Sequence, residues 1–321
     1  MTGNRLLDLL IVLAVLISAL AFAGAIYQVI ATRRSARKYP PPGRLVDVGG
    51  YRLHVQCSGP EGANAGPTVI MDAGIGECSL GWGPVVPDIA KFARVCTYDR
   101  AGLGWSDPAP TARTSLQMVS ELHALLANAG IEPPYVMVGH SFGGLNLRLY
   151  ASQFPEEVAG MVLVDSAHED YPFRSPLLTR VGLLTAPLGI PRLFARFVVS
   201  ENPIFNRDSK YPPAYRAIAT STKYLYTVMR EYSAADQSWS QGRSSKKSLG
   251  DRPLVVLLPT SNHELFPVAR KLQTELASRS TRGKLILVEN TWHHIQHDRP
   301  DAVIDAVREV FEAVRQKTNN A

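Results

Sequence analysis

The chain has 321 residues, of which 45% are apolar and 19% are charged, and this composition excludes an intrinsically disordered protein. The formal net charge is +6, but residues 1–38 hold five basic side chains and one acidic one, so most of the excess charge belongs to this segment. The remaining sequence has no basic stripe, which argues against nucleic-acid binding. Three cysteines (Cys57, Cys78 and Cys96) allow at most one intrachain disulfide and predict neither a zinc site nor a redox compartment.

The N-terminal segment is strongly apolar. No charge occurs between residues 9 and 32, and basic residues follow at 33–38. About 20 helical residues span the ~30 Å hydrocarbon core of a bilayer, so we expect a single-pass transmembrane anchor with a basic flank over residues 1–38. By the positive-inside tendency, the basic flank predicts that the following domain faces the cytoplasm.

Two alternatives to an anchor remain open. The first is a signal peptide cleaved near Ala23, which would release a secreted protein, although the apolar run continues to Ile30. The second is a buried core helix, which is disfavoured because the segment has no polar face.

After a proline-rich linker at residues 39–43, the pattern changes to short strands. A hairpin is expected around Gly49-Gly50. Continuous apolar runs that predict buried strands follow at Thr68–Met71, Val95–Tyr98, Tyr135–Val138, Met161–Val164, Leu254–Leu258 and Leu285–Val288. Helices are expected between them at Thr114–Asn128, Gly143–Phe154 and Asp301–Gln316. Strand–helix alternation predicts an α/β fold, a mostly parallel doubly wound sheet with helices on both faces.

Residues 168–250 interrupt this alternation. They are rich in proline and aromatic residues and contain helical patches. We expect a helical cap over residues 168–250, inserted before the last two strands of a core formed by residues 44–167 and 251–317.

The sequence Gly139-His140-Ser141-Phe142-Gly143 matches the G-x-S-x-G nucleophile elbow. An apolar strand precedes it and a helix follows it, as the sharp strand-to-helix turn requires. Glycines two residues on either side of the serine leave room for this turn. Ser141 is therefore the candidate nucleophile, and the alternative is an ordinary glycine-rich turn.

A serine hydroxyl needs a general base. The candidates are His293 and its neighbour His294, on the loop after the last predicted strand. The local cluster of histidines with Asp298 could instead bind a metal ion, but the segment has no H-E-x-x-H frame and is a loop.

These residues resemble the α/β-hydrolase family over about residues 44–317, in its serine hydrolase branch of esterases and lipases. Besides the elbow, Asp72–Gly76 stands where the family has its oxyanion loop, and Tyr98–Asp107 is similar to the family's D-x-x-G-x-G-x-S segment. The C-terminal stretch is similar to the family's G-H-F-x-x-x-(E/D)-x-P, which places the family histidine on His293. The resemblance implies that the oxyanion donors are the backbone N–H groups of Ile75 and Phe142.

This sequence departs from the family pattern at two positions. Trp292 replaces the usual glycine, and Ala73 replaces the histidine of the oxyanion loop. Neither change removes a reacting atom.

The acid of the triad has two candidates. The family places its carboxylate after the strand that precedes the cap or after the strand that follows it. Asp165 ends the predicted strand Met161–Val164 and suits the first position, whereas Glu264 is the only carboxylate near the second. We expect Asp165 to be the acid, with Glu264 as the alternative; a structural role for Asp165 as a turn residue is also open.

Serine at position 141 favours acyl transfer over the alkyl-enzyme chemistry of family epoxide hydrolases and dehalogenases, which carry aspartate there. The sequence contains no phosphate-binding loop and no complete dinucleotide fingerprint, so no cofactor is expected. The prediction is a serine hydrolase, most simply a carboxylic ester hydrolase, that cleaves an ester, thioester or amide of a small apolar acyl substrate. The alternatives are a non-catalytic ligand-binding protein on the same fold and a cofactor-free haloperoxidase-like activity.

Overall fold

The computed structural model describes residues 2–62, 66–171, 184–194, 212–244, 246–260 and 266–319. The chain divides into two compact units. One unit comprises residues 41–175 and 230–321, and is called the sheet unit here. The other comprises residues 1–40 and 176–229, and is called the N-terminal unit. Much of the expected cap, including residues 172–183 and 195–211, lies outside the described residues.

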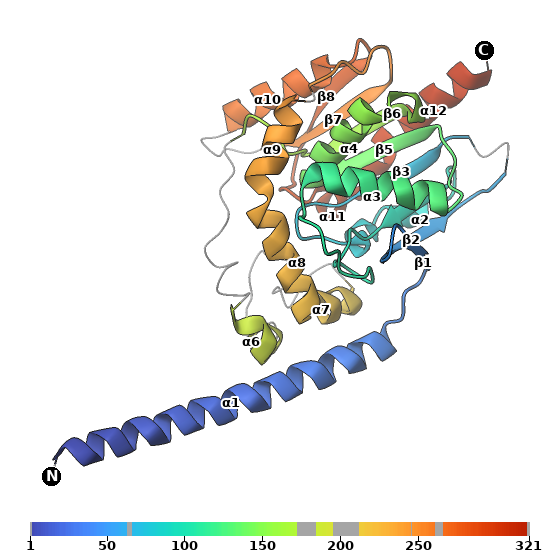
Figure 1. Ribbon diagram of the computed structural model, residues 1–321. Helices are drawn as coiled ribbons and strands as arrows, with labels where there is room; N and C mark the ends of the chain where they lie inside the picture. The colour runs from blue at the N-terminus through green and yellow to red at the C-terminus, as the bar shows by residue number, and fades with distance from the viewer. Residues whose placement is uncertain are drawn as a thin grey trace. The chain divides into compact units, whose positions relative to one another are not determined.

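Among the described residues of the sheet unit, eight strands form one sheet in the order β1-β2-β4-β3-β5-β6-β7-β8 (Figure 1). The strands are β1 (Arg44–Asp47), β2 (Arg52–Ser58), β3 (Thr68–Asp72), β4 (Val95–Tyr98), β5 (Tyr135–His140), β6 (Val158–Val164), β7 (Leu254–Pro259) and β8 (Gly283–Val288). The β1–β2 and β2–β4 pairs are antiparallel, and all the other pairs are parallel. The mostly parallel sheet predicted from the sequence is therefore confirmed.

Successive residues of a buried strand point to opposite faces of the sheet. Since the strands are apolar on both faces, helices cover both. Ile70 of β3 packs into one apolar cluster, together with residues of α3, α4 and α10. Its neighbours Val69 and Met71 pack into a second cluster with α2 and α12. The helical elements of this unit are η1 (Ser79–Trp82), α2 (Val86–Ile89), α3 (Ser115–Asn128), α4 (Phe142–Gln153), η2 (Pro155–Glu157), α9 (Ala235–Ser244), α10 (Phe266–Ser278), α11 (Ile295–Asp298) and α12 (Pro300–Asn319).

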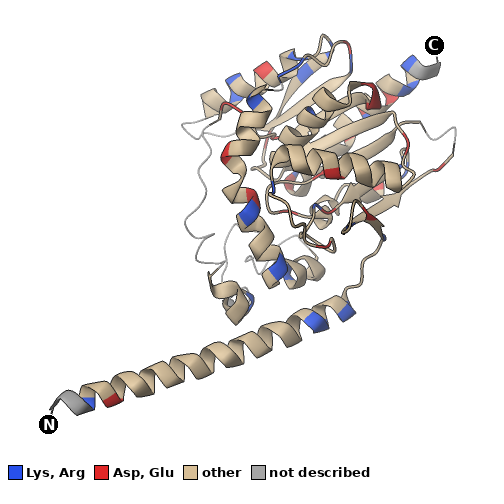
Figure 2. Cartoon of the chain, in the orientation of Figure 1, with Lys and Arg blue, Asp and Glu red and all other residues tan. Residues whose placement is uncertain are grey.

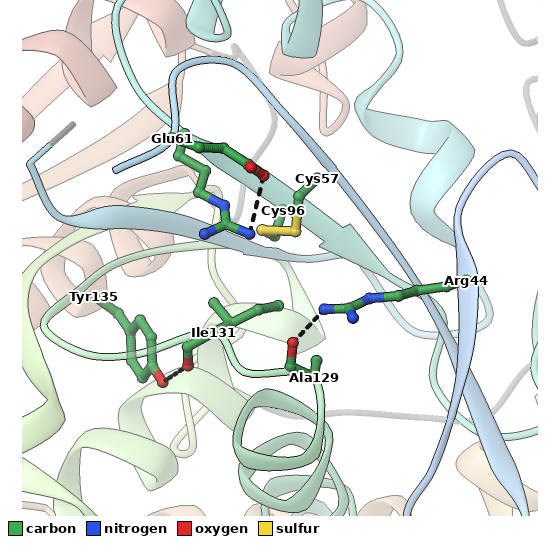
Figure 3. The surroundings of a disulfide bond; sticks show 8 residues. Arg44, Cys57, Glu61, Cys96, Ala129, Ile131 and Tyr135 are labelled. Carbon is green, nitrogen blue, oxygen red and sulfur yellow. Dashed lines mark hydrogen bonds and ion pairs between the residues drawn. A yellow bond between two sulfur atoms is a disulfide. The ribbon is translucent and has the colours of Figure 1, made fainter. Parts of the chain in front are cut away.

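A disulfide joins the two antiparallel strands β2 and β4 (Figure 3). Cys57 and Cys96 stand directly opposite each other in the ladder, which brings their sulfur atoms together. Cys78 is buried and is not part of this disulfide. Beside the disulfide, Arg94 forms an ion pair of 3.2 Å with Glu61. The structure thus selects one cysteine pair where the sequence left the pairing open.

The described helices of the N-terminal unit are α1 (Thr2–Lys38), η3 (Ala186–Leu188), α6 (Ile190–Phe194) and α7 (Pro213–Ala219), and the helix α8 (Thr222–Ser233) begins in it. Helix α1 is long and apolar enough to cross a membrane, with a mean hydropathy of 2.9 over its most apolar stretch. In Figure 2 the charged residues of α1 are coloured only near its two ends.

The C-terminal third of α1 packs against other helices of its own unit. The buried side chain of Gln28 donates a hydrogen bond of 2.9 Å to the carbonyl oxygen of Thr220. Arg192 donates to the amide oxygen of Gln28 at 3.0 Å. At Gly24 a Cβ atom would stand 2.5 Å from the carbonyl oxygen of Leu188, so α1 approaches η3 closely there. This third of the helix is therefore part of a folded unit, whereas the preceding apolar stretch is exposed.

Candidate active site

The nucleophile elbow is a sharp turn between β5 and α4. Ser141 has φ 50° and ψ −119°, a conformation that L-residues rarely adopt. A Cβ atom on Gly139 would stand 2.5 Å from the backbone of α4, and one on Gly143 would stand 2.2 Å from the carbonyl oxygen of Asp72. Both glycines of the motif are therefore required by close backbone contact. Ser141 therefore has a strained backbone conformation at the turn into α4.

Asp165 and His293 form a hydrogen-bonded pair. Asp165 directly follows β6 and also has a positive φ, of 38°. Its Oδ2 accepts a hydrogen bond of 2.6 Å from Nδ1 of His293, on the loop between β8 and α11. Desolvation lowers the pKa of His293, but the hydrogen bond and charge of Asp165 outweigh it, so the pKa is raised above its ordinary value. The carboxylate therefore fixes the imidazole orientation and stabilises its protonated form.

A cavity of about 450 Å³ opens at this edge of the sheet. All five residues that the sequence analysis places in the main site line it: Ile75, Ser141, Phe142, Asp165 and His293. The rest of its lining is mostly apolar or aromatic, and includes Tyr171, Tyr232, Trp239, Leu258, Phe266 and Leu272. The alternative acid, Glu264, lies outside the described residues.

The loop after β3 presents consecutive backbone N–H groups. The N–H of Gly74 donates to Glu77 Oε2 at 3.0 Å, and that of Gly76 donates to Glu231 Oε2 at 2.7 Å. The N–H of Ile75, between them, has no hydrogen-bond acceptor among the described residues. Phe142 is the first residue of α4, where backbone N–H groups lack a helical acceptor. Two N–H groups are thus available beside the serine.

The buried side chain of Arg100 donates hydrogen bonds to this loop and to two carboxylates beside it. Nη1 of Arg100 donates to Asp72 Oδ1 at 2.6 Å, and Nε donates to Glu231 Oε1 at 2.8 Å. Its Nη2 also donates to the carbonyl oxygen of Gly74 at 2.5 Å. Burial opposes the charge on Arg100, but the two carboxylates outweigh it and raise its pKa. The sequence analysis did not find the role of Glu231, because its partners are far away in the chain.

The second histidine of the loop occupies a different environment. His294 Nε2 lies 2.8 Å from Oε1 of Glu77 and is not paired with Asp165. Asp298 accepts hydrogen bonds from the Trp292 N–H at 3.2 Å and from the Thr291 hydroxyl at 3.3 Å. Within the described ranges, no group of three or more His, Cys, Asp or Glu side chains could hold a metal ion.

Comparisons with known proteins agree with this fold. A family model described as the alpha/beta hydrolase fold matches residues 67–205. An uncharacterized Bacillus subtilis protein, YqjL, is 29% identical over 257 residues, which cover 79% of this chain and 87% of that protein. An AB hydrolase superfamily protein of Gibberella zeae is 24% identical over 288 residues, covering 78% of this chain and 87% of that protein.

Three further proteins are similar to this chain over part or most of its length. A Saccharomyces cerevisiae protein described as an uncharacterized vacuolar membrane protein is 33% identical over 135 residues, which cover 37% of this chain and only 21% of that protein. Among solved structures, the epoxide hydrolase CorEH has a TM-score of 0.64 at 17% identity, covering 84% of this chain and 98% of its own. An esterase from Thermogutta terrifontis has a TM-score of 0.62 at 18% identity, covering 85% of this chain and 98% of its own.

The sheet order, the elbow and these matches together define the class. The chain has the α/β-hydrolase fold, which its resemblance to that family predicted.

Proposed function

We propose that this protein is a serine hydrolase that cleaves a carboxylic ester, or a thioester or amide, with an apolar acyl group. The observation that carries the proposal is the 2.6 Å hydrogen bond between Asp165 and His293 on the same cavity as the strained Ser141. A non-catalytic binding protein has no need of a strained serine beside an oriented imidazole.

The proposed reaction assigns one role to each group. His293 takes the hydroxyl proton as Ser141 attacks the carbonyl carbon, and Asp165 stabilises the resulting imidazolium. The backbone N–H groups of Ile75 and Phe142 donate to the oxyanion of the tetrahedral intermediate. His293 then protonates the leaving group, which departs and leaves an acyl-enzyme. Water, deprotonated by His293, releases the acid by the same route.

The substrate class follows from the cavity. Its apolar and aromatic lining suits an acyl chain, since apolar pockets bind apolar ligands by removing their surface from water. About 450 Å³ is enough for a small-molecule substrate. The proposed chemistry uses side chains and backbone N–H groups of this chain alone.

A screen of p-nitrophenyl esters from acetate to long-chain acyl groups, with Ser141→Ala as the control, tests this proposal. We expect turnover that depends on acyl length and is lost in Ser141→Ala. Turnover of no ester, thioester or amide by the wild-type protein would contradict the assignment.

We also infer that α1 anchors the protein in a membrane. The exposed apolar part of α1 supports an anchor, and the packing of its last third supports retention of the whole helix. Cleavage after Ala25 would remove Gly24, whose backbone lies close to η3. These observations favour the anchor over the signal peptide.

Two observations disagree about the side of the membrane on which the sheet unit lies. The basic flank of α1 favours the cytoplasm. The Cys57–Cys96 disulfide favours an oxidising compartment, because cytosolic thiols are kept reduced. We propose the oxidising side, since a disulfide within the folded domain reports on the environment of that domain itself. Digestion of the sheet unit by protease added to intact cells is the expected result, and full protection would restore the cytoplasmic assignment.

A further inference from the structure

A single buried carboxylate connects three of the four loops that carry the candidate catalytic groups, namely those of Ile75, Ser141 and His293. Oε2 of Glu77 accepts the N–H of Gly74 at 3.0 Å and lies 3.0 Å from Nδ1 of His140. Its Oε1 lies 2.8 Å from Nε2 of His294. Glu77 and His140 are both buried. One side chain therefore contacts the oxyanion loop, the nucleophile elbow and the base loop at once.

Each of these three partners is adjacent in sequence to a proposed catalytic group. Gly74 precedes Ile75, His140 precedes Ser141, and His294 follows His293. A further hydrogen bond links two of the loops directly, since Nε2 of His140 donates to the carbonyl oxygen of His293 at 2.9 Å. The relative positions of the oxyanion donor, the nucleophile and the base thus depend on this network.

The hydrogen bonds of the network require one proton between Oε2 of Glu77 and Nδ1 of His140. The carbonyl oxygen of His293 can only accept, so Nε2 of His140 carries a proton, and Glu77 faces the other ring nitrogen. Desolvation raises the pKa of Glu77, but the charges and hydrogen bonds of His140 and His294 outweigh it and lower the pKa. A carboxylate at Glu77 accepts from the N–H of Gly74 and from Nε2 of His294. It accepts from Nδ1 of His140 only when that ring carries a proton on both nitrogens, and burial opposes this by lowering the pKa of His140.

The close packing at Gly74 is a second, independent observation. A Cβ atom there would stand 2.9 Å from Oε2 of Glu77 and 3.1 Å from Nδ1 of His140. The loop therefore approaches the Glu77–His140 pair so closely that only glycine fits without displacement.

We propose that Glu77 is a positioning residue of the active site. Through Gly74, His140 and His294, it fixes the relative positions of the oxyanion loop, the nucleophile elbow and the loop that carries His293. The proposal rests on the proposed serine hydrolase function. Glu77 is absent from the described cavity lining, so it acts through these neighbours rather than on the substrate.

The test compares Glu77→Gln with Glu121→Gln. Glu121 is another buried carboxylate of the sheet unit, paired with Arg113. Active sites are counted by fluorophosphonate labelling, and kcat per labelled site and KM are measured for each variant. We expect Glu77→Gln to lower kcat per site about 10- to 100-fold with KM nearly unchanged, since small misplacements of reacting groups have effects of this size. Glu121→Gln should keep kcat per site even where its Tm falls.

Variants of His294 provide a second test of the proposal. They leave Glu77 and its contact with His140 in place. His294→Ala should lower kcat per site several-fold, and His294→Gln, whose amide can donate to Glu77, should restore most of it. An unchanged kcat per site in Glu77→Gln, or equal values in the two His294 variants, would overturn the positioning role. Absence of labelling in the wild-type protein would instead overturn the serine hydrolase function on which the role rests.

Discussion

At the scale of single residues, the proposed reaction depends on one imidazole whose two nitrogens have different roles. Nδ1 of His293 is held by Asp165, and in the proposed reaction its Nε2 exchanges a proton with Ser141. This division works only while the ring is neutral before the attack. The pH dependence of the reaction therefore reports on the Asp165–His293 pair.

The wild-type protein should lose kcat/KM as the pH falls through the raised pKa of His293, which lies above 6.5. Asp165→Asn removes the main charge that raises this pKa, so the acid limb of its residual activity should move to lower pH. Its kcat should fall about 10⁴-fold, as loss of a triad carboxylate can cause. Steady-state kinetics from pH 5 to 9 measure both effects.

Glu264→Gln is the matched variant for the alternative acid. It should leave kcat and the acid limb almost unchanged. A large loss of activity in Glu264→Gln, together with near-normal kinetics in Asp165→Asn, would exchange the roles of the two carboxylates.

The sequence predicts these residues to different degrees for a physical reason. Ser141 and His293 belong to short local motifs, and Asp165 follows a recognisable strand, so each can be located from its neighbours alone. Glu77 and Glu231 cannot, because their importance lies in contacts with segments far away: Glu231 contacts Gly76 across 155 residues. No local pattern marks such a carboxylate as part of a site.

At the scale of elements, the Cys57–Cys96 disulfide joins two strands in the antiparallel part of the sheet. Strands β2 and β4 pair side by side, and the disulfide closes a loop that spans 39 residues of sequence. The site lies at the ends of the parallel strands, on the loops after β3, β5, β6 and β8. The disulfide therefore supports the fold without touching the chemistry.

The double variant Cys57→Ala/Cys96→Ala should lower the free energy of unfolding by about 2–4 kcal/mol, because the unfolded chain regains the freedom that the closed loop removes. Urea unfolding measures this loss, and kcat per folded molecule should stay the same. The wild-type protein unfolded under a reducing agent is the control and should show a similar loss. Equal stability of the oxidised wild type and the double variant would show that the bond does not form.

The strands and the helices α3, α4 and α12 were predictable because continuous apolar runs and helical periodicity are local signals. The hairpin of β1 and β2, which belongs to the sheet, was also predictable from its two glycines, whereas α2 and α10 were not predicted. The pairing of Cys57 with Cys96 was not, because it depends on the register of β2 against β4. Sequence spacing alone does not determine that register.

At the scale of the whole molecule, α1 has two parts: an apolar part, which we propose to be the membrane anchor, and a part that packs within the N-terminal unit. The sequence shows them as one apolar segment. Its first part is exposed, and its last third contacts η3 and the residues after α7 within the N-terminal unit. The sequence predicted the apolar length of this helix, but the contact of Gln28 with Thr220 depends on folding across 192 residues.

Two truncations separate these roles. Removal of residues 1–22 should release the protein from membranes and keep kcat, since the packed third of α1 remains. Removal through Lys38 should also release it but lower its Tm, because the contacts of Gln28 are lost. Fractionation in detergent-free buffer and thermal unfolding measure the two effects. Continued membrane binding of the shorter truncation would contradict the anchor.

The central claim is that Ser141 is a nucleophile activated by His293. Labelling of the purified full chain with a fluorophosphonate, followed by peptide mass spectrometry, tests this claim most directly. We expect one label on Ser141, no label in Ser141→Ala, and a reaction slowed by orders of magnitude in His293→Ala. His294→Ala should still react. Failure of Ser141 to react while the protein is folded, or labelling that persists in Ser141→Ala, would contradict the account.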